Sequence, residues 1–353
     1  MTTRSGIVRV LVVDDSAASR ELLLGLLAAD ARVQVVGVAA DGEAAVAAAE
    51  RLRPDVITMD IHLPRLDGYA ATRRIMESCP TRIVMVTSSS LPDDVAASFR
   101  ALESGALAVL AKPPGPGHRD FAAARDELVR TVTLMAEVHV VRRWPARSSA
   151  HPPALAAPPA ARRELTVVAI GASTGGPLVL QAILSRLAPA FPAPVLVVQH
   201  ISSGFASGLA QWLAEGSGRP VCVAAHGDVP QAGMVYVAPD GAHLQWRGDG
   251  RVELVDAPPS RGFRPSIDAL FESLARHAGR RAAGILLTGM GVDGAAGLKA
   301  MRSAGALTIV QDRESAVIHG MPAEALRVGA AMHVLPPEGI ADMLGRVVNM
   351  QKG

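Results

Sequence analysis

A serine flanked by small residues is the first feature of this sequence that could carry out chemistry. The run GASTGG at residues 171–176 follows the apolar segment TVVAI and precedes PLVLQAIL, which has helical character. At such a strand-to-helix turn, small neighbours allow the sharp bend of a hydrolase nucleophile elbow, and the helix N-terminus stabilises developing negative charge. Ser173 is therefore a candidate nucleophile. A phosphate-binding loop and a plain turn remain open, although Ser173 replaces the second glycine of the dinucleotide-binding fingerprint.

A nucleophilic serine needs a base and an acid that orients the base, and nearby strand ends offer both. His200 ends the run VLVVQH, where a parallel strand would deliver its side chain to the same sheet edge as Ser173. Asp293 follows an apolar run in LLTGMGVDG, among glycines that allow close backbone approach. The remaining candidates are His243 and His319 for the base, and Asp240 and Asp312 for the acid.

A second set of polar residues stands at expected strand ends in the first third of the chain. Asp14 and Asp15 follow the first strand, Asp60 the third, Thr87 the fourth and Lys112 the fifth. Sites in open parallel sheets are built at this edge. The set suits phosphoryl transfer to the Asp60 carboxylate, with Asp14 and Asp15 as Mg²⁺ ligands and Lys112 and Thr87 facing the phosphoryl oxygens. Each residue alone could be a solvated strand end or a helix cap.

The elements that must position both sets form a repeating pattern. Short apolar runs alternate with segments of helical length, first up to a helix over residues 120–142 and again from residue 165. Continuous β-branched runs separated by helical periods predict mostly parallel sheets covered on both faces. The GDG turn in HLQWRGDGRVELV predicts an antiparallel hairpin. We therefore expect an α/β protein with two domains.

The length of 353 residues also favours two domains. We expect the first over residues 6–130, a helix end and Pro/Ala-rich linker over residues 131–164, and the second over residues 165–350. The linker is expected because residues 144–163, WPARSSAHPPALAAPPAARR, contain mainly Pro, Ala, Ser and Arg.

Composition excludes several classes of protein. The net charge is only +2, from 35 basic and 33 acidic residues, and no helix-turn-helix is evident, so we expect no nucleic-acid partner. Glycines and prolines interrupt the long uncharged runs, and no signal peptide is evident, so we expect no membrane insertion. Cys79 and Cys222 are far apart and form no CxxC motif, which argues against a disulfide framework and fits a cytoplasmic protein.

Residues 6–130 resemble the receiver domains of two-component response regulators. The resemblance is carried by the five strand-end residues, by Pro113 after Lys112 and by the stretch DIHLPRLDG. It implies a flavodoxin-like (βα)5 fold and a histidine kinase as phosphodonor. It also implies Asp60 as phosphoacceptor, Asp14, Asp15, Asp60 and the backbone carbonyl of His62 as Mg²⁺ ligands, and Thr87 and Lys112 as the switch. Receivers usually carry an aromatic residue three positions before the lysine, where this chain has Val109.

The whole chain, linker included, resembles the chemotaxis response-regulator protein-glutamate methylesterases, the CheB family. The shared motifs, in order, are GASTGG, VVQH, VAPDGAHL, FRPSID, LLTGMGVDG and IHGMP. The resemblance implies a doubly wound catalytic domain and a triad of Ser173, His200 and Asp293 as nucleophile, base and orienting acid. It further implies that Thr174 and the backbone around Met290 line the oxyanion region and that Arg264 to Ser266 shape the substrate cleft. His319 stands where many relatives carry an aromatic residue.

The activity implied by this resemblance is hydrolysis of glutamate γ-methyl esters on chemoreceptors, with no cofactor in the catalytic domain. The resemblance also implies that the unphosphorylated receiver packs over the catalytic cleft and that phosphorylation of Asp60 loosens this contact. Deamidation of receptor glutamines would use the same acyl chemistry. The alternative is a non-catalytic response regulator whose second domain binds a protein. A nicotinamide enzyme is disfavoured by Ser173 and by Gln199 and His200, which end the strand where an acidic residue is needed.

Overall fold

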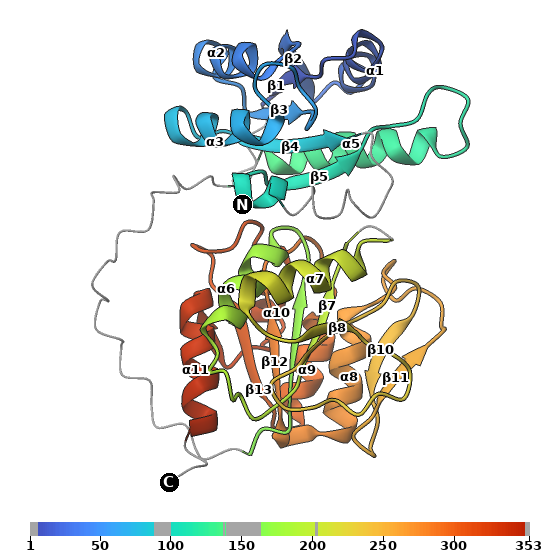
Figure 1. Cartoon of the computed structure of the whole chain (residues 1–353). Helices are drawn as coiled ribbons and strands as arrows, with labels where there is room; N and C mark the ends of the chain where they lie inside the picture. The colour runs from blue at the N-terminus through green and yellow to red at the C-terminus, as the bar shows by residue number, and fades with distance from the viewer. Residues whose placement is uncertain (1–5, 88–99, 137, 139–163, 202–203, 350–353) are drawn as a thin grey trace. The chain divides into compact units, whose positions relative to one another are not determined.

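The computed structural model describes residues 6–87, 100–136, 138, 164–201 and 204–349. The chain divides into two compact units, Met1–Ala150 and His151–Gly353, and each has its own sheet (Figure 1). The expected linker over residues 131–164 lies mostly outside the described residues, so its extended form stays a prediction. No described helix is both long enough and apolar enough to cross a membrane.

The first unit is a five-stranded sheet in the order β2-β1-β3-β4-β5, in which all neighbours are parallel. Packing of α1 against α5 and of α2 against α3 shows that helices cover both faces. The elements are β1 (Val8–Val13), α1 (Ala17–Ala28), β2 (Val33–Ala39), α2 (Gly42–Leu52), β3 (Val56–Met59), α3 (Gly68–Ser78), β4 (Arg82–Thr87), β5 (Ala108–Ala111) and α5 (Phe121–Met135). Residues 100–104 are also helical. The flavodoxin-like prediction is confirmed for the five strands.

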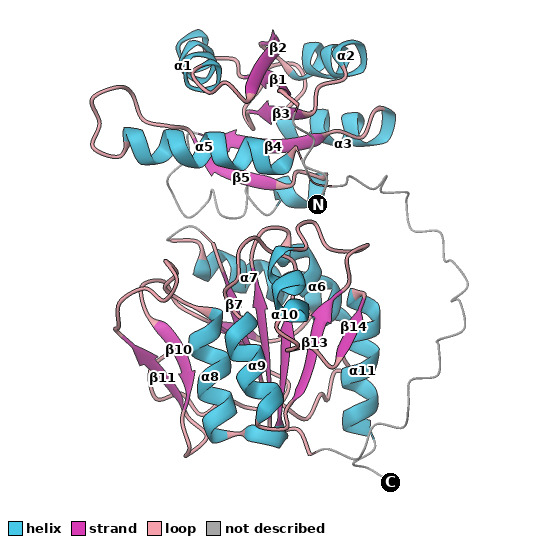
Figure 2. Ribbon diagram, turned by 180° about the vertical axis from the view of Figure 1, so that it is seen from behind, coloured by secondary structure: helices cyan, strands magenta, loops and turns pink. Residues whose placement is uncertain are grey.

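The second unit is a seven-stranded sheet in the order β14-β13-β12-β6-β7-β9-β8, again with only parallel neighbours. Helices α6, α7 and α11 pack together, as do α8, α9 and α10 (Figure 2). The strands are β6 (Val167–Ala172), β7 (Val195–Gln199), β8 (Val221–Val223), β9 (Val235–Val237), β12 (Ala282–Leu286), β13 (Leu307–Gln311) and β14 (His333–Leu335). The helices are α6 (Gly176–Arg186), α7 (Ala206–Ser217), α8 (Ile267–His277), α9 (Ala295–Ser303), α10 (Gly320–Arg327) and α11 (Pro337–Asn349), with a 3-10 turn at Gly279–Arg281.

The predicted hairpin forms a sheet of its own. β10 (His243–Trp246) pairs antiparallel with β11 (Val252–Val255), with His243 opposite Val255 and Trp246 opposite Val252. Leu244 and Trp246 belong to the same buried cluster as Leu270 and Phe271 of α8. The hairpin therefore packs on α8, as the views in Figures 1 and 2 agree.

A glycine near the end of β6 brings α8 close to the sheet. A Cβ atom on Gly171 would lie 2.3 Å from Cγ2 of Ile267, the first residue of α8. Any side chain at this position would push α8 away, because such a contact is far shorter than the sum of van der Waals radii. The bare backbone thus sets the N-terminus of α8 against the carboxyl edge of the sheet.

Candidate functional site

The three residues of the expected triad follow three neighbouring strands. Ser173 comes directly after β6, His200 directly after β7, and Asp293 in the loop between β12 and α9. Because β6 lies between β12 and β7, and all three strands are parallel, their carboxyl ends meet at one edge. The sheet thus brings together strand ends whose following residues are 27 and 93 positions apart in sequence.

His200 and Asp293 form a buried pair. Nε2 of His200 lies 2.9 Å from Oδ2 of Asp293, and the two side chains are 6% and 0% exposed. Nδ1 of His200 is buried and has no hydrogen-bond partner among the described residues. An ionised Asp293 can only accept, so Nε2 carries a proton, and in the neutral imidazole Nδ1 then keeps a lone pair. His200 is therefore oriented with a free basic nitrogen.

Asp293 is held by the first turn of α8. Its Oδ1 accepts from the Ser266 hydroxyl at 2.8 Å and from the Asp268 amide at 3.1 Å, and its Oδ2 accepts from the Ile267 amide at 2.8 Å as well as from His200. Burial opposes ionisation of Asp293, but the hydrogen bonds from His200 and from Ile267 outweigh it and hold the pKa below the usual aspartate value. The carboxylate is a fixed anion at a helix N-terminus.

An aromatic ring covers His200. The rings of His200 and Phe263 are stacked, with centroids 3.8 Å apart and parallel planes. Phe263 lies in the loop between β11 and α8, where a reciprocal pair of backbone hydrogen bonds with Ser260 closes a tight turn. The stacking restricts the imidazole to one plane. Sequence reasoning missed this contact, because an isolated phenylalanine in a polar loop carries no periodic signal.

Gln199 connects the nucleophile and the base. Its buried Nε2 donates to the carbonyls of both Ser173 and His200 at 2.8 Å. The amide N–H of Ser173 donates to the Thr288 carbonyl at 3.0 Å, so both backbone polar groups of Ser173 are engaged. Hydrogen bonds with Gln199 and Thr288 thus fix the backbone that carries the Ser173 side chain. The sequence placed Gln199 at a strand end but gave no indication of this bridge.

The expected oxyanion region lies beside Ser173. Thr174 lies just before α6, whose N-cap Gly175 has a φ of 79°. A Cβ atom on Gly289 would lie 2.6 Å from Cβ of Ser173, so the backbone that leads to Met290 contacts the nucleophile closely. The Thr288 hydroxyl donates to the Thr174 carbonyl at 3.0 Å and ties the two segments together.

The two residues expected in the substrate cleft have different environments. Arg264 is partly exposed and its Nη1 donates to Oδ1 of Asp256 at 2.7 Å. Ser266 has no exposed surface; it is the N-cap of α8 and donates to Asp293. Ser266 was expected to shape the substrate cleft, and its fully buried hydroxyl contacts Asp293.

The alternative bases and acids have other surroundings, and three of the four make hydrogen bonds away from Ser173 and His200. Nδ1 of His243 accepts from the Ser266 amide, and its Nε2 lies 3.1 Å from the Pro258 carbonyl. His319 precedes α10, its backbone bridges Gly289 in a parallel pair, and burial lowers its pKa, while its Nε2 is buried and has no hydrogen-bond partner among the described residues. The remaining two are Asp312, which accepts from Ser315, and Asp240, which accepts from the Gly204 amide.

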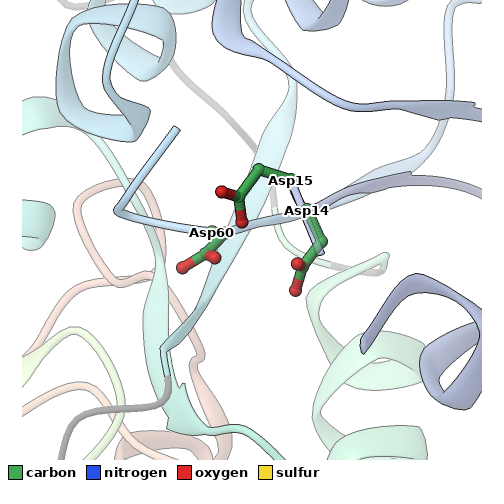
Figure 3. Close-up of side chains that lie close together, drawn as sticks. All are labelled: Asp14, Asp15 and Asp60. Carbon is green, nitrogen blue, oxygen red and sulfur yellow. The ribbon is translucent and has the colours of Figure 1, made fainter. Parts of the chain in front are cut away.

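The first unit brings its acidic residues together at the carboxyl edge of its sheet (Figure 3). Asp14, Asp15 and Asp60 each offer a carboxylate oxygen, and these atoms lie within 4.8 Å of one another. Asp14 and Asp60 are buried and Asp15 is exposed. Hard carboxylate oxygens with excess negative charge fit a divalent cation such as Mg²⁺.

Lys112 is the counter-charge of this cluster. Its Nζ lies 2.7 Å from Oδ2 of Asp14 and 2.7 Å from Oδ2 of Asp60. Burial raises the pKa of Asp60, and nearby Asp14 adds to the effect although Lys112 opposes it. Burial also disfavours the Lys112 charge, but the bonds to Asp14 and Asp60 outweigh it and raise the lysine pKa. Among the described residues, Asp60 otherwise accepts only a long bond, 3.4 Å, from the amide of His62.

Two further receiver positions complete the expected set. The Thr87 hydroxyl is buried at the end of β4 and has no hydrogen-bond partner among the described residues. An unpaired buried hydroxyl is costly, so it suits a ligand that would accept from it. Val109, on β5, packs against the core of the unit.

Comparisons with known proteins agree over almost the whole chain. A family model described as the CheB methylesterase matches residues 168–344, and one described as the response regulator receiver domain matches residues 10–118. The protein-glutamate methylesterase/protein-glutamine glutaminase 4 of Geobacter metallireducens is 52% identical over 96% of this chain and 98% of its own length. A relative of the same description from Syntrophus aciditrophicus is 47% identical over 96% of this chain and 97% of its own length.

A solved structure gives the same result for the second unit. The crystal structure of the Thermotoga maritima CheB methylesterase catalytic domain is 35% identical and covers 52% of this chain and 99% of that domain, with a TM-score of 0.51. The long relatives, the two matching family models and this domain together identify the chain: it belongs to the CheB methylesterase family and carries a response regulator receiver domain ahead of its methylesterase domain.

Proposed function

We propose that this chain is a phosphorylation-regulated protein-glutamate methylesterase that hydrolyses glutamate γ-methyl esters on chemoreceptors and deamidates receptor glutamines in chemosensory adaptation. The relatives that carry this description are 44–52% identical over nearly their full lengths. The observation that carries the proposal is the buried His200–Asp293 pair, which leaves Nδ1 of His200 free at the sheet edge where β6 delivers Ser173.

In the acylation step, Nδ1 of His200 takes the proton of the Ser173 hydroxyl as its oxygen attacks the γ-carbonyl carbon. The protonated imidazole then gives that proton to the departing methoxide, and methanol leaves an acyl-serine. Asp293 stabilises the imidazolium and keeps its Nε2–H in place. The amide N–H of Thr174 and the backbone around Met290 are the proposed donors to the oxyanion.

In the deacylation step, His200 removes a proton from water, and the resulting hydroxide attacks the acyl carbon. The Ser173 oxygen leaves with the proton held by His200, and a free glutamate carboxylate is released. A glutamine side chain would follow the same sequence, with ammonia in place of methanol. The same groups of the chain thus serve both reactions.

In the first unit, Asp60 is the proposed phosphoacceptor and a histidine kinase the proposed donor. Asp14, Asp15, Asp60 and the backbone carbonyl of His62 would hold Mg²⁺, which when bound offsets the charge of the phosphoryl oxygens. Lys112 would contact the transferred group. The Thr87 hydroxyl is unpaired among the described residues and would donate to a phosphoryl oxygen. This movement of Thr87 is the proposed switch that follows phosphorylation.

In receivers the movement of the threonine is usually coupled to an aromatic residue, and Val109 stands at that position. The substitution alters only this second step of the switch. A valine cannot swing between exposed and buried positions as a ring does, so the signal depends on Thr87. We propose that the reaction takes place in the cytoplasm, where the free Cys79 and Cys222 stay reduced.

The test is methanol release from a methylated chemoreceptor by the full-length protein, with and without a small phosphodonor and Mg²⁺. We expect release that the donor stimulates, that Ser173→Ala abolishes, and that Asp60→Asn makes insensitive to the donor. Release by Ser173→Ala at the wild-type rate would refute the acyl-enzyme. Absence of release under every condition would favour the second class of function, a response regulator whose second domain only binds a partner.

A further inference from the structure

We propose that His243 is a positioning residue of the catalytic site. It binds both ends of the loop between β11 and α8, and this loop holds the two partners of the His200 ring, Phe263 and Asp293. This inference rests on the proposed function and names a residue outside the triad. His243 begins β10, the first strand of the hairpin, and its side chain is buried, with 3% of the residue exposed.

The hydrogen bonds of His243 fix its protonation. Nδ1 accepts from the Ser266 amide at 3.2 Å, and an amide N–H can only donate, so Nδ1 carries no proton. Nε2 lies 3.1 Å from the Pro258 carbonyl, which can only accept, so Nε2 carries the proton. The structure therefore assigns the neutral Nε2–H tautomer, with both nitrogens engaged.

Pro258 and Ser266 lie near the two ends of the segment between β11 and α8. Between them lies Phe263, whose ring stacks on His200 at 3.8 Å. At the far end, the Ser266 hydroxyl donates to Oδ1 of Asp293 at 2.8 Å, and Asp293 accepts from Nε2 of His200. The face and the edge of the catalytic imidazole are thus both held by a loop that closes on His243.

The hairpin gains a function from this arrangement. It packs on α8 through Leu244 and Trp246, and the amide of Trp246 donates to the Ser273 hydroxyl of that helix at 2.9 Å. These contacts hold β10 against α8, and His243 extends this attachment to the helix N-terminus that supports Asp293. A rigid support of this kind matters because small misplacements of reacting groups cost large factors in rate.

Two variants separate the two hydrogen bonds. The side-chain oxygen of Asn takes the place of Nδ1, so His243→Asn keeps an acceptor for Ser266 and loses the bond to Pro258. The side-chain amide of Gln reaches the place of Nε2, so His243→Gln keeps the bond to Pro258 and loses the acceptor. We expect kcat of His243→Asn to exceed that of His243→Gln by about tenfold, with KM within about threefold of wild type for both.

A packing role gives the opposite order, because Gln is closer to His in volume. Equal kcat values for the two variants, a higher kcat for His243→Gln, or a change confined to KM would overturn the proposal. His277, exposed in the last turn of α8, offers the matched control. His277→Asn and His277→Gln should both release methanol at the wild-type rate.

A second measurement does not depend on activity. In the full-length wild-type protein, the ¹⁵N spectrum of the imidazoles should show a protonated Nε2 and an unprotonated Nδ1 for the signal that disappears in His243→Asn. An Nδ1–H tautomer or an imidazolium at neutral pH would overturn the proposal. If wild type releases no methanol, the proposed function fails while this spectrum still decides the state of His243.

If both His243 variants fail to fold, variants of Ser266, which connects His243 to Asp293, replace them. Ser266→Thr keeps the hydroxyl donor to Asp293, and Ser266→Ala removes it. We expect kcat of Ser266→Thr to exceed that of Ser266→Ala by about tenfold, with similar KM. Equal values would show that the loop does not act on Asp293, which contradicts the proposal.

Discussion

Asp60 and Asp293 are both buried at the carboxyl edge of a parallel sheet, yet their surroundings push their pKa values in opposite directions. Asp293 accepts four hydrogen bonds, from His200, Ser266, Ile267 and Asp268, and its negative charge is favoured. Burial dominates at Asp60, which has Lys112, one long amide contact and the like charge of Asp14 around it.

The difference separates two roles for the same side chain. When donors occupy its lone pairs, a carboxylate is a fixed anion, suited to orient a base. When few donors occupy them and like charge lies nearby, it keeps oxygens that can bind a cation or attack phosphorus. Among the described residues, Asp293, the expected orienting acid, thus has more donors than Asp60, the expected phosphoacceptor.

The largest expected effect comes from removing the anion of Asp293. In Asp293→Asn, one oxygen becomes an amide that faces donors, so the His200 tautomer is no longer fixed. We expect kcat for methanol release to fall by about 10⁴-fold, the loss that this change causes in other serine hydrolases. Incorporation of phosphate at Asp60 should stay at the wild-type level. A loss below tenfold would mean that the four donors to Asp293 do not serve catalysis.

Substitution of two glycines tests whether the exact positions of Ser173 and Asp60 matter for the two reactions. A Cβ atom on Gly289 would lie 2.6 Å from Cβ of Ser173, and one on Gly68 would lie 2.1 Å from the carbonyl oxygen of Asp60. We expect Gly289→Ala to lower kcat of methanol release by about 100-fold, since displacement of reacting groups by 1 Å has such an effect. Gly68→Ala should lower the rate of phosphate incorporation by a similar factor.

Each alanine variant should affect only the reaction of its own unit. Gly289→Ala should incorporate phosphate normally, and Gly68→Ala should keep its unstimulated methanol release. Gly345→Ala on α11 is the control, because a Cβ atom there meets nothing within 4 Å. If both site variants matched this control, the close approach of backbone to each group would have no consequence.

The smallest expected effect is on stability, and it has opposite signs at the two sites. The lowered pKa of Asp293 contributes stability that is present above the unfolded value, about 3.9, and is lost as pH falls through the folded value. The raised pKa of Asp60 means that its ionisation costs stability, in full above the folded value and not at all below about 3.9.

Calorimetry of the full-length protein with a chelator present would measure both. At pH 7 we expect Asp60→Asn to raise the unfolding midpoint of its unit by about 2–4 °C, and Asp293→Asn to lower that of the other unit by at least as much. Both differences should shrink as pH approaches 3. Shifts of the same sign would break the comparison between the two carboxylates.

Parts of this picture could be predicted from sequence because they depend on local patterns. The parallel strands follow from continuous apolar runs, the hairpin from the GDG turn after Trp246, and the sheet edge from residues at strand ends. Once β6, β7 and β12 are neighbours, Ser173, His200 and Asp293 must lie near one another. The strand-end rule therefore supplied most of both candidate sites.

The supporting contacts could not be predicted, since they join residues without a shared pattern. Phe263 reaches His200 across a loop, and Gln199 bonds two carbonyls through a side chain that strand periodicity treats as an ordinary terminal residue. Ser266 was placed in the cleft because its motif was known and its burial was not. His243 stood among the possible bases, while both of its nitrogens are engaged in bonds to the loop.

The strand order of the second unit also has a consequence for synthesis on the ribosome. β6 is the first strand of this unit to be made, yet it lies between β7 and β12. One of its edges stays unpaired until β12 emerges, about 110 residues later, and unpaired strand edges invite wrong pairing. During this interval the nascent chain carries Ser173 without Asp293, and the open edge of β6 is exposed to wrong pairing.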